Sequence, residues 1–107
     1  MEISDEILDE AYPIYEEFGP DRRIDRRERL AGVFPQLSSA EIETLADRMA
    51  KVSETVWRIA EKGGETKLGK DAVERLLQQE HPFLKNKGLN EAAFLVNYYA
   101  WHEGYDK

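Results

Sequence analysis

The sequence predicts an all-α protein, a compact bundle of about five helices around one long central helix at roughly residues 38–63. Three observations support this class. The central stretch contains no proline and no glycine before Gly63. Its apolar residues recur at alternating spacings of three and four. No segment of the chain shows the alternation of a strand. With 107 residues, the chain is expected to form a single helical domain, 1–107.

The central helix has clear signals at both ends. Ser38 and Glu41 have the spacing of a capping box, and Gly63 with Gly64 is typical of a helix stop. One apolar stripe consists of Ile42, Leu45, Met49, Val52, Val56 and Ile59, and a second of Ala46, Ala50, Ser53, Trp57 and Ala60. Because the two stripes cover nearly half of the circumference, we expect neighbouring helices on two sides.

Two helices are predicted before the central one. Residues 3–18 form the first, with an inner stripe of Ile7, Ala11, Ile14 and Phe18 and with Leu8 and Tyr15 beside it. Pro13 lies within it, and we expect a kink or a break there, because proline lacks the N–H of a helical hydrogen bond. Asp21 is expected to cap the second helix, which runs to about Val33.

After the central helix, the segment GGETKLG is predicted to be a loop. A shorter helix over residues 70–80 follows and buries Val73, Leu76 and Leu77. The segment HPFLKNKGLN then forms a ten-residue connection, which Phe83 and Leu84 attach to the core. The GGETKLG loop resembles that of an EF-hand, but Thr66 and Ala72 replace its required glycine and bidentate acid, so we expect no calcium site.

The last helix is predicted to begin at Asn90 as its cap, with Leu89 and Phe94 as a hydrophobic staple. Nine of the ten residues from Ala92 to Trp101 are apolar or aromatic. A terminal helix of a small domain is hard to bury on every side. Either the other helices surround it, or one of its faces meets another molecule.

Four aromatic residues follow helical spacing in this segment: Phe94, Tyr98, Trp101 and Tyr105. Core is the favoured interpretation for Phe94 and Tyr98, and Tyr98 is kept as an interface candidate as well. Trp101 and Tyr105 lie near the terminus and are predicted to form an interface, where tryptophan and tyrosine are enriched. A two-fold dimer is the simplest way to cover such a face.

A ligand pocket on the same helix is the alternative hypothesis, with Asn97, Tyr99, His102 and Glu103 as its rim. A metal would need His81 to join His102 and an acid, but no two histidines share the diagnostic spacing on one helix. We therefore expect no metal site and no cofactor. The chain has no cysteine, its serines fit capping or packing, and no catalytic residue is assigned.

The net charge of −7 comes from one end of the chain. Residues 1–20 contain no base and seven acids, namely Glu2, Asp5, Glu6, Asp9, Glu10, Glu16 and Glu17. Four arginines follow as a candidate anion patch, Arg22, Arg23, Arg26 and Arg27. The favoured interpretation of this run is a solvated face with local ion pairs, and pairing with the acidic start is a third possibility.

These features predict a small acidic module that docks a protein partner or self-associates, and we expect a homodimer. It could inhibit or adapt a basic protein, because its acidic segment would attract one. The alternative is a pocket on the last helix that binds a ligand or metal, in a catalytic or a purely binding role. Binding of nucleic acid through the arginines ranks third and is not expected. With no membrane-length apolar run and an acidic start, we expect no membrane association and a cytoplasmic location.

Overall fold

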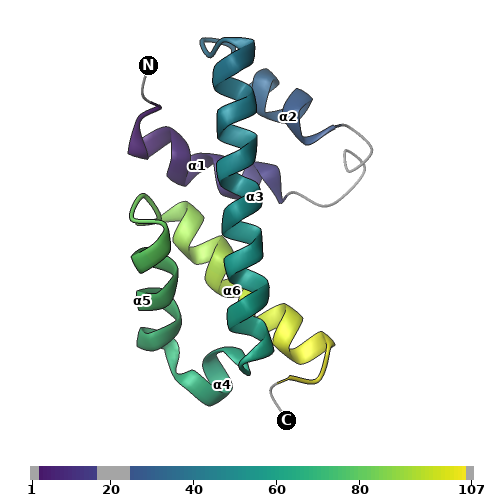
Figure 1. Ribbon diagram of the computed structural model, residues 1–107, viewed down its shortest axis with the longest axis vertical. Helices are drawn as coiled ribbons and strands as arrows, with labels where there is room; N and C mark the ends of the chain where they lie inside the picture. The colour runs from purple at the N-terminus through teal and green to yellow at the C-terminus, as the bar shows by residue number, and fades with distance from the viewer. Residues whose placement is uncertain (1–2, 17–24, 106–107) are drawn as a thin grey trace.

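The computed structural model describes residues 3–16 and 25–105, and these residues form six helices and no strand. The helices are α1 (Asp5–Tyr15), α2 (Arg26–Val33), α3 (Ser39–Glu61), α4 (Gly64–Leu68), α5 (Lys70–Glu80) and α6 (Lys87–His102). The predicted all-α class is confirmed, with the long helix α3 as its main axis (Figure 1). Within the described ranges, no helix combines the length and the apolar character needed to cross a membrane.

Helix α3 begins and ends where its local signals predict. The Ser38 hydroxyl accepts a hydrogen bond from the Glu41 N–H at 3.2 Å, and the Glu41 carboxylate accepts one from the Ser38 N–H at 2.9 Å. At the other end, Gly63 has a φ of 100°, the left-handed conformation that favours glycine. The capping box and the glycine stop are therefore confirmed.

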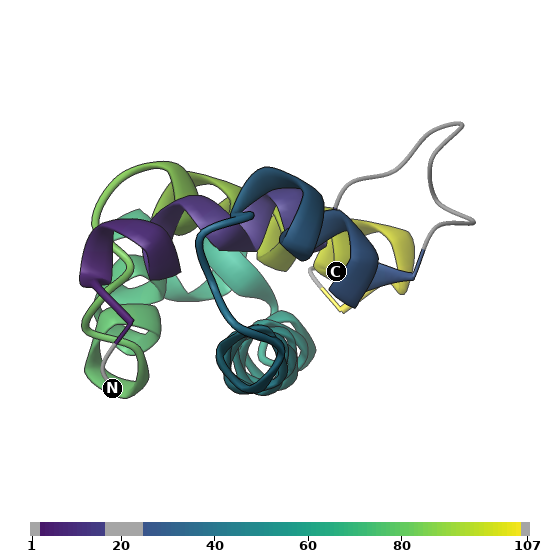
Figure 2. The ribbon, with the colours of Figure 1, turned by 90° about the horizontal axis from the view of Figure 1, so that it is seen from above.

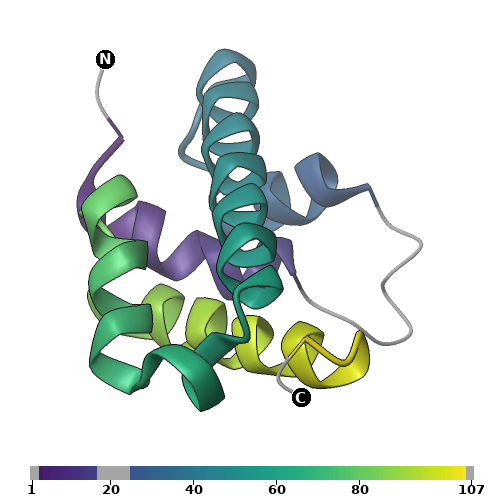
Figure 3. The same ribbon diagram turned by 60° about the horizontal axis from the view of Figure 1, so that its bottom comes forward.

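The other helices pack against α3 in two ways. Helix α5 runs back alongside it, whereas α1 and α6 cross it obliquely (Figures 1 and 3). Figure 2, which looks down the axis of α3, shows α1 and α6 together on one side of that helix. Helix α2 contacts both α1 and α3. Antiparallel packing alongside α3 thus describes α5, but not α1 or α6.

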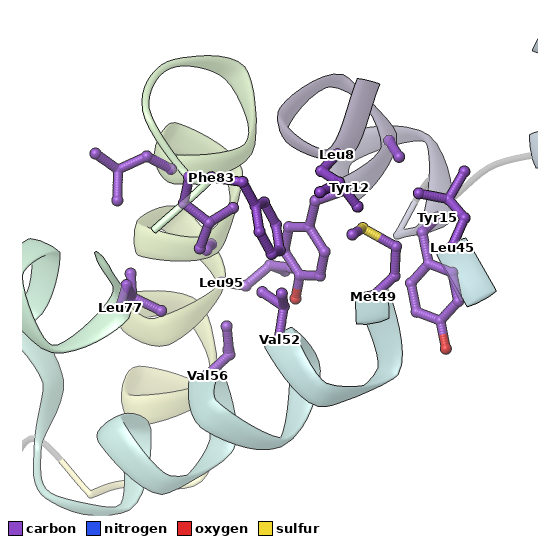
Figure 4. Close-up of a cluster of buried hydrophobic side chains, with 14 of the residues drawn as sticks. Leu8, Tyr12, Tyr15, Leu45, Met49, Val52, Val56, Leu77, Phe83 and Leu95 are labelled. Carbon is purple, nitrogen blue, oxygen red and sulfur yellow. The ribbon is translucent and has the colours of Figure 1, made fainter. Parts of the chain in front are cut away.

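The core lies between α3 and the layer of α1 and α6. Met49 and Val52 are fully buried, as the heptad spacing predicts. From α1, the buried aromatic side chains are Tyr12 and Tyr15, and Figure 4 shows Tyr12 reaching from α1 toward Val52. Phe83 and Leu84 of the connection are also buried, so their attachment to the core is confirmed.

The inner face of α1 differs from the predicted stripe. Leu8, Ala11 and Tyr12 are the most deeply buried residues of this helix. Ile7 and Ile14 are only partly buried, and Phe18 lies outside the described residues. The buried side of α1 is therefore centred on Tyr12, whose large ring lies between α1 and α3.

Helix α1 continues through Pro13 as one element, so the break considered above does not occur. Proline leaves the Asp9 carbonyl without its helical N–H partner. A Cβ atom on Gly88 would lie 2.6 Å from this carbonyl oxygen, which shows how closely the backbone of α6 approaches it. Glycine is therefore the residue that this contact between α1 and α6 allows.

The prediction that Asn90 caps the last helix is wrong. Helix α6 begins at Lys87, because the Asp9 side chain on α1 takes over the role of a local cap. Its Oδ1 accepts hydrogen bonds from the backbone N–H groups of Lys85 (2.9 Å), Asn86 (3.2 Å) and Gly88 (3.1 Å). A carboxylate at a helix N-terminus satisfies free N–H groups and is favoured by the helix dipole. Leu89 therefore lies within the first turn.

Two smaller differences concern α2 and the segment after α3. Helix α2 is described from Arg26, with the Asp25 carboxylate accepting the Arg27 N–H at 2.8 Å. The predicted cap, Asp21, lies outside the described residues. The expected loop GGETKLG contains the five-residue helix α4. A helix this short follows from tertiary contacts with α5 and α6 rather than from an apolar repeat.

Candidate functional site

One face of α6 remains uncovered. The buried residues of this helix are small or aliphatic, namely Gly88, Leu89, Ala92, Leu95, Val96 and Ala100. On the opposite side, Phe94 is 62% exposed, Tyr98 42% and Trp101 66%. The core assignment of Phe94 and Tyr98 is therefore wrong. The aliphatic residues already occupy the side of α6 that faces α1 and α3, and the aromatic spacing runs along the other side.

These exposed rings contact one another along the helix. The Tyr98 ring lies 6.3 Å from that of Phe94 and 6.3 Å from that of Trp101, between centroids. The His102 ring stacks against Tyr98 at 5.7 Å. Tyr98 is thus the centre of a continuous row, and the predicted interface residues Tyr98 and Trp101 are neighbours in it.

The row extends onto α3 through Tyr99. The Tyr99 ring stacks on that of Trp57, with centroids 4.3 Å apart and an angle of 9° between the planes. Trp57 is 38% exposed. We call the six residues Trp57, Phe94, Tyr98, Tyr99, Trp101 and His102 the aromatic face. Sequence reasoning placed Trp57 in a stripe of small residues. Its size, exceptional in that stripe, was the available signal for a different role.

The third interface candidate, Tyr105, lies beyond the end of α6. It is 36% exposed, and its backbone N–H donates to the Ala100 carbonyl at 2.8 Å after a turn at Gly104, whose φ is 76°. Within the described part of the chain, its ring makes no aromatic contact. Tyr105 therefore lies outside the aromatic face as defined.

The four residues proposed as a pocket rim have separate partners. Asn97 ties α6 to α4, since its Oδ1 accepts from the Glu65 N–H at 2.9 Å and its Nδ2 donates to Glu65 Oε2 at 2.8 Å. His102 Nδ1 lies 3.5 Å from Glu103 Oε1, and both side chains are exposed. The surface clefts of about 380, 350 and 280 Å³ are lined by residues outside this set.

The described half of the arginine run is paired with acids. Arg26 Nη2 lies 3.8 Å from Glu16 Oε2, and its guanidinium lies 4.5 Å above the Tyr15 ring centroid. Arg27 Nε lies 2.9 Å from Glu43 Oε1. Arg22 and Arg23 lie outside the described residues. These contacts agree with ion pairing, and Arg26 with Glu16 is one pair between the arginine run and the acidic start.

A partly buried polar cluster lies between α1 and α3. The Ser53 hydroxyl donates to the carboxylate of Glu16, which is only 5% exposed. Because the serine proton is used there, the Tyr12 hydroxyl donates to Ser53 Oγ at 3.3 Å. Burial, and then the Glu16 charge, raises the pKa of Tyr12 far above its ordinary value. Burial and Glu16 also raise the pKa of Glu91.

Neither histidine of the chain is hydrogen-bonded to Ser53, whose hydroxyl bonds to Glu16 and Tyr12. His81 is bonded to Thr55, and His102 is paired with Glu103. Sequence reasoning explained Ser53 by packing and did not predict its buried carboxylate partner. In residues 3–16 and 25–105, no three or more histidine and acidic side chains gather in a way that could hold a metal ion.

Comparison with protein-family models, curated protein sequences and solved structures finds no significant match for this chain.

Proposed function

We propose that this chain is a protein-interaction module that self-associates through the aromatic face of α6. The exposure of Phe94, Tyr98 and Trp101, by 62%, 42% and 66%, is the observation that carries the proposal. Single exposed apolar residues are ordinary on soluble proteins, but contiguous patches mark interaction sites. Here the rings contact one another and continue onto α3 at Trp57, so they form one surface.

The size of the face supports a weak, reversible dimer. Four rings of the aromatic face are about half exposed on average, namely Trp57, Phe94, Tyr98 and Trp101. Because an aromatic side chain covers roughly 150–250 Å², these four rings present on the order of 400 Å². Pairing two copies would bury roughly 800 Å² from these rings alone, and surrounding side chains add to it. This total falls at the lower end of specific interfaces, where complexes are transient.

The charge pattern favours a second copy as the occupant. No charged residue occurs between Glu91 and His102 on α6. A two-fold axis brings equivalent surfaces together, so charges at its centre would repel their own copies. The central rings of Phe94, Tyr98 and Trp101 carry no charge and avoid this cost. Phe94 and Trp101 flank Tyr98 on the same stripe. An antiparallel crossing of two α6 helices at Tyr98 would place Phe94 of each copy against the partner's Trp101.

Light scattering over a micromolar to millimolar concentration series tests this proposal. The wild-type chain should show a reversible monomer–dimer equilibrium. Trp101→Ala and Phe94→Ala should shift it toward monomer while far-UV circular dichroism remains unchanged, because aromatic anchors dominate interface energies. Val33→Ala is a matched control, since Val33 is 52% exposed on α2, outside the aromatic face. A wild-type chain that remains monomeric throughout would overturn self-association.

A further inference from the structure

One edge of α3 carries a regular polar stripe that the aromatic face does not include. Arg48, Lys51, Thr55 and Arg58 follow each other at spacings of three, four and three, so they share one side of the helix. This side faces the connection between α5 and α6. The contact is shown by Thr55 Oγ1, which lies 2.9 Å from His81 Nε2.

The hydrogen bonds of Thr55 determine which nitrogen of His81 carries the proton. The Thr55 hydroxyl donates its one proton to the Lys51 carbonyl at 3.2 Å and accepts from Arg58 Nη2 at 3.0 Å. With the Thr55 proton on the Lys51 carbonyl, the remaining contact at 2.9 Å is donated by His81 Nε2. In the neutral ring, Nδ1 is then a hydrogen-bond acceptor.

His81 lines a half-open cleft of about 280 Å³, together with Arg48, Lys51, Glu80, Pro82 and Phe83. The His81 side chain is mostly buried, at 9% exposure. Its Nδ1 makes no hydrogen bond within the described residues, yet it is not sealed from solvent. The cleft is therefore lined by a largely buried ring whose Nδ1 remains accessible to a bound molecule.

The charges around the cleft favour an anion. Glu80 is neutralised by Arg58, whose Nη2 lies 2.7 and 2.8 Å from the two carboxylate oxygens. Arg48 and Lys51 have no acidic partner within residues 3–16 and 25–105. Two uncompensated cations on adjacent turns of α3 thus face the same space as His81.

We propose that this cleft binds a phosphate group, free or as a monoester, with Arg48 and Lys51 contacting its charge and His81 Nδ1 sharing a proton with one phosphate oxygen. A hydrogen bond between Nδ1 and an oxyanion requires one proton, either on the ring or on the ligand. A phosphate monoester, with a second pKa of about 6, supplies this proton close to neutral pH. A carboxylate does not, because its pKa is about 4.

The surroundings of His81 make this binding dependent on pH. Burial lowers the pKa of His81 most strongly. The Glu80 charge and a hydrogen bond to the Lys51 backbone act in the opposite direction, and the charges of Arg58 and Lys51 lower the pKa again. The free protein therefore has a neutral ring at pH 7. Above the second pKa of the phosphate, binding must take up a proton, so the affinity should fall by up to about tenfold per pH unit.

Isothermal titration calorimetry with inorganic phosphate and with phosphoserine tests the proposal. Arg48→Ala and Lys51→Ala should each weaken binding by about tenfold, the loss expected for one charge-assisted hydrogen bond. Lys62→Ala is the matched control, because Lys62 is an exposed cation of α3's C-terminal end outside the cleft. It should leave the affinity unchanged. Tighter binding of phosphoserine assigns the site to a monoester, and tighter binding of inorganic phosphate assigns it to the free anion.

Nitrogen-15 NMR of the histidine rings provides the second measurement. Phosphate at neutral pH should shift the Nδ1 resonance of His81 and leave His102 unchanged, since His102 lies on the aromatic face. Binding should also be tighter at about pH 6.5 than at about pH 8. The proposal is overturned if neither phosphate binds, if Lys62→Ala weakens binding as much as Lys51→Ala, or if the His81 ring does not respond.

Discussion

Replacement of Asp9 by alanine should destabilise the protein more than replacement of an exposed acid on the same helix. Asp9 is 7% exposed, and its Oδ1 accepts the N–H groups of Lys85, Asn86 and Gly88. Loss of a helix cap costs ~1 kcal/mol. Lys85 and Asn86 are exposed residues whose N–H groups can turn to water, whereas the bond to Gly88 is buried. An orphaned buried donor costs a further ~1–3 kcal/mol.

We therefore expect Asp9→Ala to lower the free energy of unfolding by about 3 kcal/mol, which corresponds to a fall in Tm of roughly 12 °C or more. Asp9→Asn keeps an acceptor oxygen and loses the charge, so its cost should be about 1 kcal/mol. Urea unfolding monitored by far-UV circular dichroism measures both values.

Glu6→Ala is the matched control, because Glu6 is an exposed acid on the same helix. Its effect should remain within about 0.5 kcal/mol. If Asp9→Ala unfolds at the same urea concentration as this control, the carboxylate does not support the start of α6, and the explanation of the early helix start is wrong.

Three further changes have defined outcomes. Val52→Asp should cost ~3–5 kcal/mol, because Val52 is fully buried and the new carboxylate would have no partner. A wild-type melting temperature would contradict this. His81 has a lowered pKa, so the unfolded chain takes up a proton at about pH 6.5 where the folded chain resists it, and stability should fall as the pH drops below that value. His81→Gln should reduce this slope in urea titrations at several pH values, and an unchanged slope would refute the assignment. Asn97→Ala should lower the free energy of unfolding by ~1 kcal/mol. It should also accelerate hydrogen exchange at the Glu65 N–H, which donates a hydrogen bond to Asn97 Oδ1. Unchanged exchange there would show that Asn97 does not tie α6 to α4.

The features that the sequence predicted correctly are those with local causes. Ser38 and Glu41 are three residues apart and cap the start of α3. Gly63 has no side chain and so adopts the left-handed conformation that ends the helix. Both bounds of α3 therefore follow from residues close in the sequence. The burial of Met49 and Val52 follows from a spacing of three and four that only one face of a helix satisfies.

The features that it missed depend on residues distant in the chain. Asp9 is nearly eighty positions from the helix that it caps, and no local rule connects it with Gly88. Helical spacing predicts that Phe94 and Tyr98 share one side of α6, but it does not say whether that side is covered. The side that α6 buries depends on where α1 and α3 lie, and the smaller residues Ala92 and Leu95 fit that contact. The pairing of Ser53 with Glu16 is likewise a tertiary contact.

The candidate sites divide in the same way. Aromatic residues at helical spacing predicted that Tyr98 and Trp101 would share a surface, and they do. Trp57 joins that surface only because α6 crosses α3 beside it, which the spacing within α3 cannot indicate. The cleft at His81 was also not predicted, since Arg48 and Lys51 on α3 reach it only when the α5–α6 connection folds back onto that helix.

The central claim is that the aromatic face of α6 meets its own copy. A filtered NOE experiment on a mixture of isotope-labelled and unlabelled chains detects contacts between copies without altering any residue. We expect intermolecular signals that join the ring protons of Phe94 in one copy to those of the partner's Trp101, with Tyr98 near the two-fold axis. Intermolecular signals confined to other helices, or none at concentrations where light scattering shows a dimer, would contradict the account.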